Sequence, residues 1–186
     1  MKILVVGSGG REHALDWLKK NRADLVVVGP DNYLEEGIVD KIKELGIPVF
    51  GPTKAAAEIE WSKSFAKQFM KEEGIPTASF YVFSDYKKAS EYIKTQKFPL
   101  VIKASGLALG KGVIIAHNLN EAEQALKKMM SDRVFGNAGT EVIVEEYLHG
   151  REISIHAFCD GETAVLFPAA QDHKRIFDED QGPNTS

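Results

Sequence analysis

The stretch VIKASGLALGKGVIIA, residues 101–116, decides how the middle of this chain folds. Apolar and β-branched residues open and close it, and they predict two strands, at residues 100–104 and 113–116. The loop between the strands holds three glycines and Lys111, and Lys103 interrupts the first strand. A glycine flap that carries one lysine, next to a strand that presents another, suits the binding of a triphosphate.

This loop is not a P-loop. Lys111 is followed by Gly112, where a P-loop needs Ser or Thr, and the loop joins two strands, where a P-loop joins a strand to a helix. The alternative is an ordinary glycine hairpin with solvated lysines. Lys103 argues against that alternative, because it lies inside an otherwise apolar strand.

Acidic residues follow on the C-terminal side of this stretch. Strands are predicted at residues 141–146, 152–159 and 163–167, and Asp160-Gly161 is a hairpin turn dipeptide. Carboxylates lie at the end of the first of these strands and at the start of the second, and they can accept hydrogen bonds from an exocyclic amine or from ribose hydroxyls. The alternative is a solvated acidic turn. From residue 169 onward no periodicity remains, which predicts a loop up to the last residue.

The N-terminal side predicts a smaller α/β piece. Strands at residues 2–6 and 24–28 alternate with a helix at 11–20 and with one helix that carries Leu34, Ile38, Ile42 and Leu45 on a single face. A very short strand follows within residues 46–52, so a three-stranded parallel sheet is expected. Residues 7–10, Gly-Ser-Gly-Gly, either hold a phosphate at a helix N-terminus or form a tight connection.

Between the two pieces, helices are predicted at residues 54–60 and 62–73, and a strand at 80–83 and helices at 86–94 and 119–130 complete the second unit. The predicted fold class is therefore α/β. We expect an N-terminal parallel-sheet domain at residues 1–53, a helical linker at 54–78 and an α+β domain at 79–186.

Composition narrows the function classes. With 44% hydrophobic and 27% charged residues the chain is typical of globular proteins, and a net charge of -4 provides no basic field for nucleic acid. Apolar runs are strand-sized, and the N-terminus has no cleavage site of a secretory signal, so no membrane association is expected. The lone Cys159 agrees with a reducing, cytoplasmic setting.

Several motifs resemble known families. Lys63 in WSKSF, the VIKASGLALGKG loop and the VEEYLHGRE strand pair resemble the ATP-grasp superfamily. GSGGREHAL, DLVVVGP, FGPTKAAAEIEWSK and AQDHKR followed by DEDQGPNT are similar to the phosphoribosylamine-glycine ligase family within it. The resemblance implies a pre-ATP-grasp, Rossmann-like N-terminal domain followed by the N-terminal part of an ATP-grasp domain.

The resemblance also implies an activity. Family members activate glycine with ATP as glycyl phosphate, and the amine of phosphoribosylamine attacks this intermediate in purine biosynthesis. The implied cofactors are ATP and Mg²⁺ or Mn²⁺, with metal ligands expected beyond the end of this chain. The implied partners are the small molecules glycine and phosphoribosylamine, with neither nucleic acid nor membrane, and the chain alone is expected to be inactive.

The resemblance implies ATP contacts for ten residues, namely Lys63, Lys103, Gly106, Gly110, Lys111, Gly112, Glu145, Glu146, Leu148 and Glu152. Within this set, residues 145, 146 and 148 form an adenine-binding hinge and residue 152 contacts the ribose. It implies substrate contacts for eleven more, namely Gly9, Gly10, Arg11, Glu12, Gln171, Asp172, His173, Lys174, Asp180, Pro183 and Asn184. No catalytic residue and no metal ligand is assigned within the chain.

The chain departs from the family pattern at three places. Only residues 16–23 separate the REHA helix from the DLVVVGP strand, where the family carries additional βα structure, so a truncated N-terminal domain is expected. Asp31 and Tyr33 replace the usual glutamate and proline after VGP, and the motif that continues past GPNT in the family stops at Ser186. Two rival hypotheses remain: another ATP-grasp carboxylate-amine ligase, and a non-catalytic nucleotide-binding fragment.

Overall fold

A computed structural model of the chain describes residues 1–7, 11–108, 110–171, 175–177 and 181–184. The chain divides into two units, Met1–Tyr147 and Leu148–Ser186. The first unit contains two sheets, each with its own apolar core, and the second contains hairpins.

The N-terminal sheet is parallel, as predicted. It consists of β1 (Ile3–Val6), β2 (Leu25–Val28) and β3 (Val49–Phe50) in the order β1-β2-β3. Helix α1 (Arg11–Lys20) connects the first two strands, with the bounds that the sequence predicts. Val26 in the central strand β2 is completely buried in the apolar core of this sheet, as expected for a strand of a parallel sheet that is covered by other elements.

The single helix predicted after β2 is wrong. The structure has two helices, α2 (Asp31–Glu35) and α3 (Ile38–Glu44). Gly37, the N-cap residue of α3, takes a left-handed conformation with φ 73°, which an uninterrupted α-helix does not contain. The apolar spacing continues across this break, so the periodicity alone could not detect it.

Two helices lead from this sheet to the next. Helix α4 (Lys54–Trp61) is capped by the Thr53 hydroxyl, which accepts from Ala56 N at 3.3 Å. Helix α5 (Lys63–Glu72) follows after one residue, because Ser62 leaves the helical conformation and caps α5 with its own hydroxyl. The two predicted helices are confirmed.

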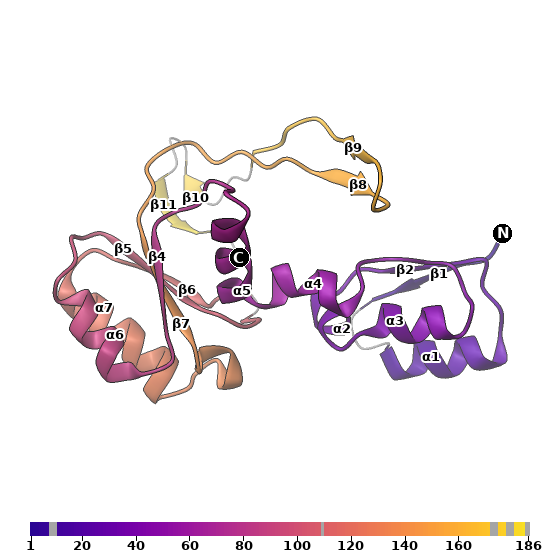
Figure 1. Cartoon of the computed structure of the whole chain (residues 1–186), viewed down its shortest axis with the longest axis horizontal. Coiled ribbons are helices and arrows are strands. Elements are labelled where there is room, and N and C mark those ends of the chain that lie inside the picture. Colours follow the sequence, from indigo (N-terminus) through magenta and orange to yellow (C-terminus); the bar gives the residue numbers. More distant parts are fainter. Residues whose placement is uncertain (8–10, 109, 172–174, 178–180, 185–186) are drawn as a thin grey trace. The chain divides into compact units, whose positions relative to one another are not determined.

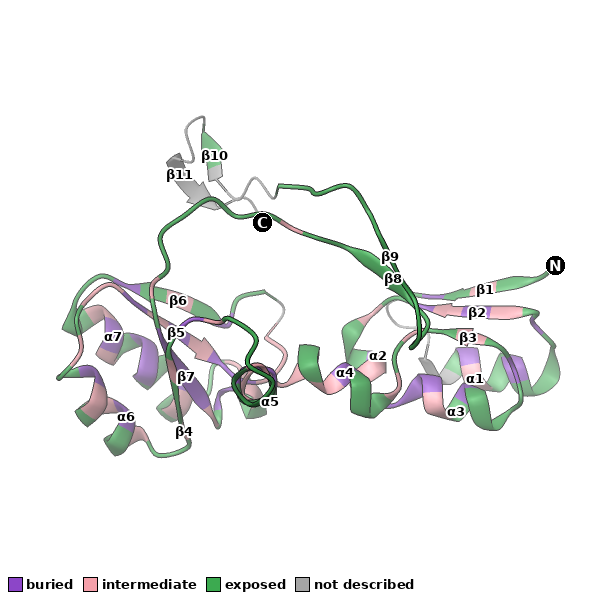
Figure 2. Ribbon diagram, turned by 45° about the horizontal axis from the view of Figure 1, so that its top comes forward, coloured by how far each residue is buried: buried purple, intermediate pink, exposed green. Residues whose placement is uncertain are grey.

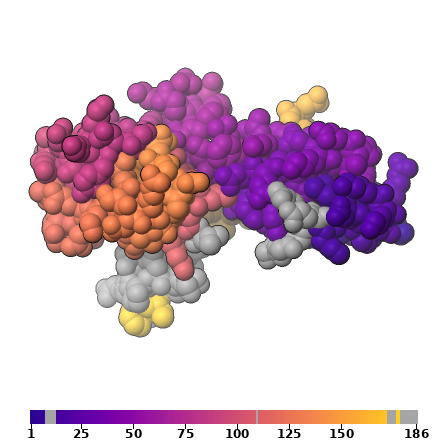
Figure 3. All heavy atoms as spheres, turned by 90° about the horizontal axis from the view of Figure 1, so that it is seen from below, coloured from indigo at the N-terminus to yellow at the C-terminus, as the bar shows by residue number. Residues whose placement is uncertain are grey.

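The second sheet is antiparallel and has the order β4-β7-β5-β6. Its strands are β4 (Phe80–Phe83), β5 (Leu100–Ala104), β6 (Val113–Ala116) and β7 (Val142–Glu146), all of which the sequence predicts. Helices α6 (Tyr86–Ile93) and α7 (Leu119–Leu126) lie side by side over one face, and α5 lies over the other (Figure 1). In the space-filling view, the pink part of the chain that contains α6 adjoins the orange part that contains α7 (Figure 3). The face toward α6 and α7 holds the main core, including Leu100, Ile102, Val142 and Val144.

The helix predicted at residues 119–130 changes its form at its end. Its α-helical part stops at Leu126 and continues as a π-helical turn, η1 (Lys127–Ser131), in which Asp132 N donates to Lys127 O at 2.8 Å. A 3₁₀ turn, η2 (Gly136–Gly139), then leads into β7. A Cβ on Gly139 would lie 2.4 Å from the carbonyl oxygen of Met129, so only glycine lets the two turns approach this closely.

The second unit is built from short hairpins. Strands β8 (Ala157–Cys159) and β9 (Ala164–Leu166) are antiparallel and exposed along their length (Figure 2). The Asp160-Gly161 turn is confirmed: the Asp160 carboxylate accepts from the backbone N–H groups of Glu162 and Thr163. The strand predicted at 152–159 is shorter, with only an isolated bridge between Ser154 and Ala170 before β8.

The loop predicted from residue 169 to the end is wrong. Strands β10 (Arg175–Phe177) and β11 (Gln181–Asn184) pair in antiparallel fashion there, with an irregular register. The two strands are defined by backbone hydrogen bonds, which any residue type can make. The sequence therefore shows no alternation of apolar residues from which the strands could be predicted. Within the described ranges, no helix has the length and apolar character needed to cross a membrane.

The break at Gly37 leads to a test of this fold. Replacing Gly37 by Ala is expected to lower the free energy of unfolding by about 1 kcal/mol, because a Cβ disfavours φ 73°, and Gly37→Asn is expected to cost less. Urea denaturation measures both. Gly29→Ala is the matched control, since its Cβ would meet only Val6 O at 3.8 Å. An equal loss of unfolding free energy in Gly37→Ala and Gly29→Ala would contradict the left-handed conformation assigned to Gly37.

Candidate functional site

The second sheet carries charged side chains on the face that α6 and α7 leave uncovered. Val101 pairs with Glu145 and Lys103 pairs with Ile143, so Lys103 and Glu145 are diagonal neighbours on that face. Their charged groups meet, with Lys103 Nζ 2.8 Å from Glu145 Oε2. The Glu145 side chain is only 4% exposed, whereas that of Lys103 is 26% exposed. The sequence predicted both residues, and the structure brings them together.

Helix α5 supplies a second cation to the same carboxylate. Lys67 Nζ lies 3.3 Å from Glu145 Oε2, and it also donates to Thr77 Oγ1 at 2.7 Å and to Ala78 O at 3.4 Å. The ring of Phe80 lies 5.6 Å from the same ammonium. We call Lys63, Lys67, Lys103 and Glu145 the lysine cluster. Lys67 was missed at the sequence level, although it lies one helical turn after Lys63, on the same face of α5.

Lys63 connects α5 to the start of the glycine loop. Its backbone N–H donates to Ser105 O at 2.8 Å, and its ammonium donates to Gly106 O at 2.9 Å. The Ser105 hydroxyl donates to Ser64 Oγ at 2.8 Å and adds a third connection. Burial lowers the pKa of Lys63, the nearby Glu60 raises it, and the Lys103 charge lowers it again.

Glycines shape the loop itself. A Cβ on Gly106 would lie 2.8 Å from Ala138 Cα, and one on Gly112 would lie 2.6 Å from Ala108 Cβ. Gly110 has φ 74°, which favours glycine, and the neighbouring Lys111 is exposed. The predicted flap residues therefore form a tight loop whose first residues pack against η2.

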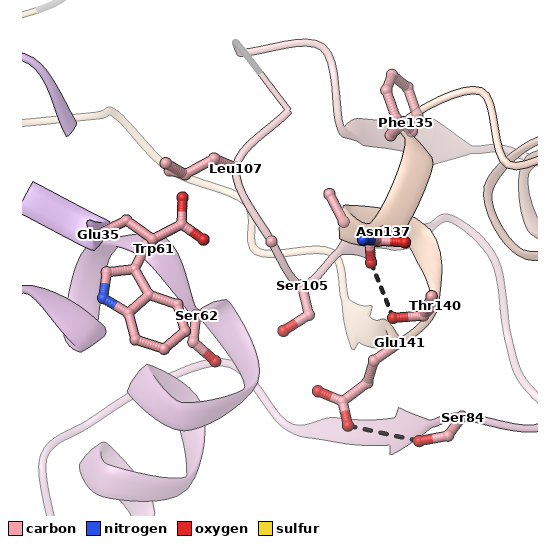
Figure 4. A pocket seen from close by; sticks show the side chains of 12 residues that line it. Glu35, Trp61, Ser62, Ser84, Ser105, Leu107, Phe135, Asn137, Thr140 and Glu141 are labelled. Atoms are coloured by element: carbon pink, nitrogen blue, oxygen red, sulfur yellow. Dashed lines mark hydrogen bonds between the residues drawn. The ribbon is translucent and has the colours of Figure 1, made fainter. Parts of the chain in front are cut away.

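A cavity of about 620 Å³ lies beside the start of this loop (Figure 4). Ser105, Gly106 and Leu107 form one side of it, and residues 137–141 another. Glu141 Oε2 accepts from Ser84 Oγ at 3.5 Å, and Thr140 Oγ1 donates to Asn137 O at 2.8 Å. The lining combines hydroxyl, amide and carboxylate groups with the apolar side chains of Trp61, Leu107 and Phe135, so it suits a ligand that has both polar and apolar parts.

The remaining residues with implied ATP contacts lie near the end of β7. Glu146 Oε1 accepts from Ser79 N at 2.8 Å, and this backbone hydrogen bond is the main reason that the pKa of Glu146 is lowered. Leu148 and Glu152 belong to the second unit, where both are exposed. Glu145 and Glu146 thus end the last strand of the first unit, whereas Leu148 and Glu152 follow in the second unit.

Most of the residues with implied substrate contacts lie outside the part of the chain that the structure describes. Gly9 and Gly10, and likewise Asp172, His173, Lys174 and Asp180, lie outside the described residues. Arg11 and Glu12 begin α1, Gln171 is exposed, and Pro183 and Asn184 lie in β11. In the described part of the chain, no three His, Cys, Asp or Glu side chains gather in a way that could hold a metal ion.

Two family models match the chain. Residues 61–186 match the phosphoribosylglycinamide synthetase ATP-grasp (A) domain, and residues 15–60 match the phosphoribosylglycinamide synthetase N domain. A phosphoribosylamine–glycine ligase of Streptococcus pyogenes serotype M1 is 44% identical over 226 aligned residues, which cover all of this chain and 54% of the relative. The corresponding ligase of Streptococcus pneumoniae serotype 4 is 42% identical with the same coverage.

Solved structures give the same result. The crystal structure of phosphoribosylamine–glycine ligase from Thermotoga maritima has a TM-score of 0.78 and 32% identity, covering all of this chain and 54% of its own. N5-carboxyaminoimidazole ribonucleotide synthetase from Thermus thermophilus, with a TM-score of 0.65 and 24% identity over 90% of this chain and 42% of its own, shares the fold. The chain thus spans about half the length of the relatives it matches. The alignment with the streptococcal ligase covers 226 residues against 186 here, so that ligase carries residues within the matched region that this chain lacks.

The environment of Lys63 leads to a pH prediction. Because the Lys103 charge lowers the pKa of Lys63 and Glu60 raises it, Lys103→Met is expected to raise this pKa and Glu60→Gln to lower it. The pH dependence of modification by an amine-reactive reagent, read at Lys63 by mass spectrometry, measures both. Replacement of the exposed Lys43 by Met is the control. A pKa of Lys63 that moves in the same direction in both variants would contradict the described arrangement.

Proposed function

The chain belongs to the phosphoribosylglycinamide synthetase family, and we propose that it forms the ATP-binding part of a ligase that joins glycine to 5-phosphoribosylamine. The products of that reaction are glycinamide ribonucleotide, ADP and phosphate. The observation that carries the proposal is the lysine cluster directly under a glycine loop in a chain 44% identical to a phosphoribosylamine–glycine ligase.

Lys63 and Lys103 bind the phosphates in this proposal. Both ammonium groups lie on the same side of the second sheet, one beside the loop and one at the strand that leads into it. Their charge offsets that of the triphosphate, and fixed cations of this kind accelerate phosphoryl transfer mainly by positioning and by stabilising the developing charge. The loop from Gly106 to Gly112, with Lys111, then covers the phosphates.

The hydrogen bond of the Lys63 ammonium couples the start of the glycine loop to nucleotide binding. Without ligand it donates to the carbonyl of Gly106. A phosphate oxygen is a stronger acceptor for an ammonium than a neutral carbonyl. Nucleotide therefore competes for Lys63 and frees the first residue of the loop from this contact.

The adenosine end is assigned to the chain after β7. Glu145, Glu146 and Leu148 form the adenine hinge, and Glu152 binds the ribose hydroxyls. The hydrogen bonds between Glu146 and Ser79 support this assignment, because they fix the end of β7. The backbone N–H and C=O groups that follow Glu146 are then the ones that can pair with the adenine base. The acceptor site is assigned to the residues with implied substrate contacts in the N-terminal glycine turn and in residues 171–184.

The proposal keeps two domains, at residues 1–53 and 79–186, joined by a helical linker at residues 54–78. A divalent metal would supply further phosphate neutralisation in a ligase of this kind. The described residues do not form a group of ligands for it, and no step is assigned to a metal here. Another ATP-grasp ligase is the second candidate, but identity to phosphoribosylamine–glycine ligases over the whole chain favours the first.

Nucleotide binding is tested by thermal unfolding of this chain with and without Mg-ATP. A ligand at about 100 times its dissociation constant stabilises the folded state by about 2.7 kcal/mol, so a clear rise in Tm is expected. Lys63→Met and Lys103→Met are each expected to remove most of that rise, whereas Lys43→Met, on α3, keeps it. A rise of equal size in all four proteins would contradict the assigned phosphate contacts.

The choice of reaction is tested by ADP release. Because this chain alone is expected to be inactive, the assay uses the intact homologous ligase, in which ADP is expected to form only when both glycine and phosphoribosylamine are present. ADP release without glycine would rule out the glycine ligase and support the second candidate.

A further inference from the structure

We propose that Lys67 is a positioning residue that shares the charge of Glu145 and so leaves the positive charge of Lys103 available to nucleotide phosphates. The inference rests on the proposed ATP site, because Lys103 is one of its phosphate contacts. It concerns a residue that the sequence patterns did not select.

Lys67 does not itself reach a ligand. An ammonium has three N–H donors, and those of Lys67 have three acceptors in the structure: Glu145 Oε2, Thr77 Oγ1 and Ala78 O. Its side chain is 9% exposed and lies against Phe80. Lys67 is therefore fixed in the protein interior and acts on a ligand only through its charge and through Glu145.

Lys103 is placed differently. Among the described residues, Glu145 is the one ion-pair partner that the structure gives it, and a quarter of its side chain is exposed. Two of its three donors are therefore available for a ligand. Lys103 is the accessible end of a group whose other members are buried.

The charges of the three residues show what Lys67 adds. Both ammonium groups contact the same oxygen, Glu145 Oε2, and Oε1 has no hydrogen-bond partner among the described residues. Two cations and one carboxylate leave one positive charge, which is exposed only at Lys103. Without Lys67, the buried carboxylate would be balanced by Lys103 alone, because buried charges require a partner. The ion pair of Lys103 and Glu145 would then have no net charge, and it would attract a triphosphate less strongly.

A purely structural role for Lys67 is the competing explanation, since the ion pair also connects α5 to β7. The two explanations differ in how the ligand's charge matters. Loss of a structural connection weakens adenosine and ATP alike. Loss of a charge weakens ATP and leaves adenosine nearly unchanged, because only ATP carries the phosphates.

The experiment compares the dissociation constants of ATP and adenosine by calorimetry with this chain. Lys67→Met is expected to weaken ATP about tenfold and adenosine less than twofold. The effect on ATP is smaller than that of a direct charge contact near a protein surface, because Lys67 does not touch the phosphates. The double variant Lys67→Met with Glu145→Gln restores one net positive charge. Because Glu145 also belongs to the assigned adenine hinge, whose change affects ATP and adenosine alike, the readout is the ratio of the two affinities, and this ratio is expected to return to near its wild-type value. Lys71→Met is the matched control, because Lys71 is an exposed lysine one turn further along α5.

A second variant covers the case in which Lys67→Met does not fold. Lys67→Gln removes the charge but keeps a polar group near Thr77 and Ala78, and the same ATP-specific loss is expected. Equal weakening of ATP and adenosine in the folded single variants would overturn the inference. So would a ratio of ATP to adenosine affinity that stays low in the double variant.

A readout without nucleotide separates this inference from the proposed function. In Lys67→Met, Glu145 pairs with Lys103 alone, so modification of Lys103 by an amine-reactive reagent is expected to be slower than in the wild type and to recover in the double variant. If the wild-type chain fails to bind ATP, the proposed function is contradicted, and this rate alone decides whether Lys67 controls Lys103. An unchanged rate would overturn the inference.

Discussion

A single buried carboxylate organises the face of the second sheet that carries the candidate site. Glu145 is almost inaccessible to solvent, and it holds one lysine from β5 and one from α5 on the same oxygen. Removing either cation would leave the carboxylate undercompensated in a medium of low polarity, which is costly. The connection between α5 and β7 and the direction of the Lys103 side chain both depend on this charge balance.

Local patterns were sufficient for most of the fold. Alternating or continuous apolar runs predicted the strands of both sheets, because each strand buries a face and the side-chain period is two. The misplaced elements have non-local or backbone causes. Gly37 breaks a helix whose apolar spacing continues across it, the π-helical turn depends on close packing with Gly139, and β10 and β11 pair without an apolar pattern.

The candidate site was predictable only in part. Lys103 and Glu145 were recognisable, since each interrupts or ends an apolar strand, and the resemblance to ATP-grasp proteins added Lys63. Lys67 could not be selected in this way, because a lysine on an amphipathic helix is ordinarily solvated. Only the register of β5 against β7 and the packing of α5 over them show that it is buried against a carboxylate.

Three main-chain hydrogen bonds hold the base of the glycine loop: Lys63 N to Ser105 O, Ser105 N to Glu141 O and Gly106 N to Ala138 O. Hydrogen bonds of this kind do not depend on which side chains the residues carry. During divergence, side chains around the loop that make no contact at its base can therefore change without moving it. The exceptions are Gly106, because of its close approach to Ala138, and Lys63 and Ser105, whose side chains make hydrogen bonds there. Related proteins with this fold can therefore differ in the side chains that contact the substrate and still keep the same backbone position at the base of the glycine loop.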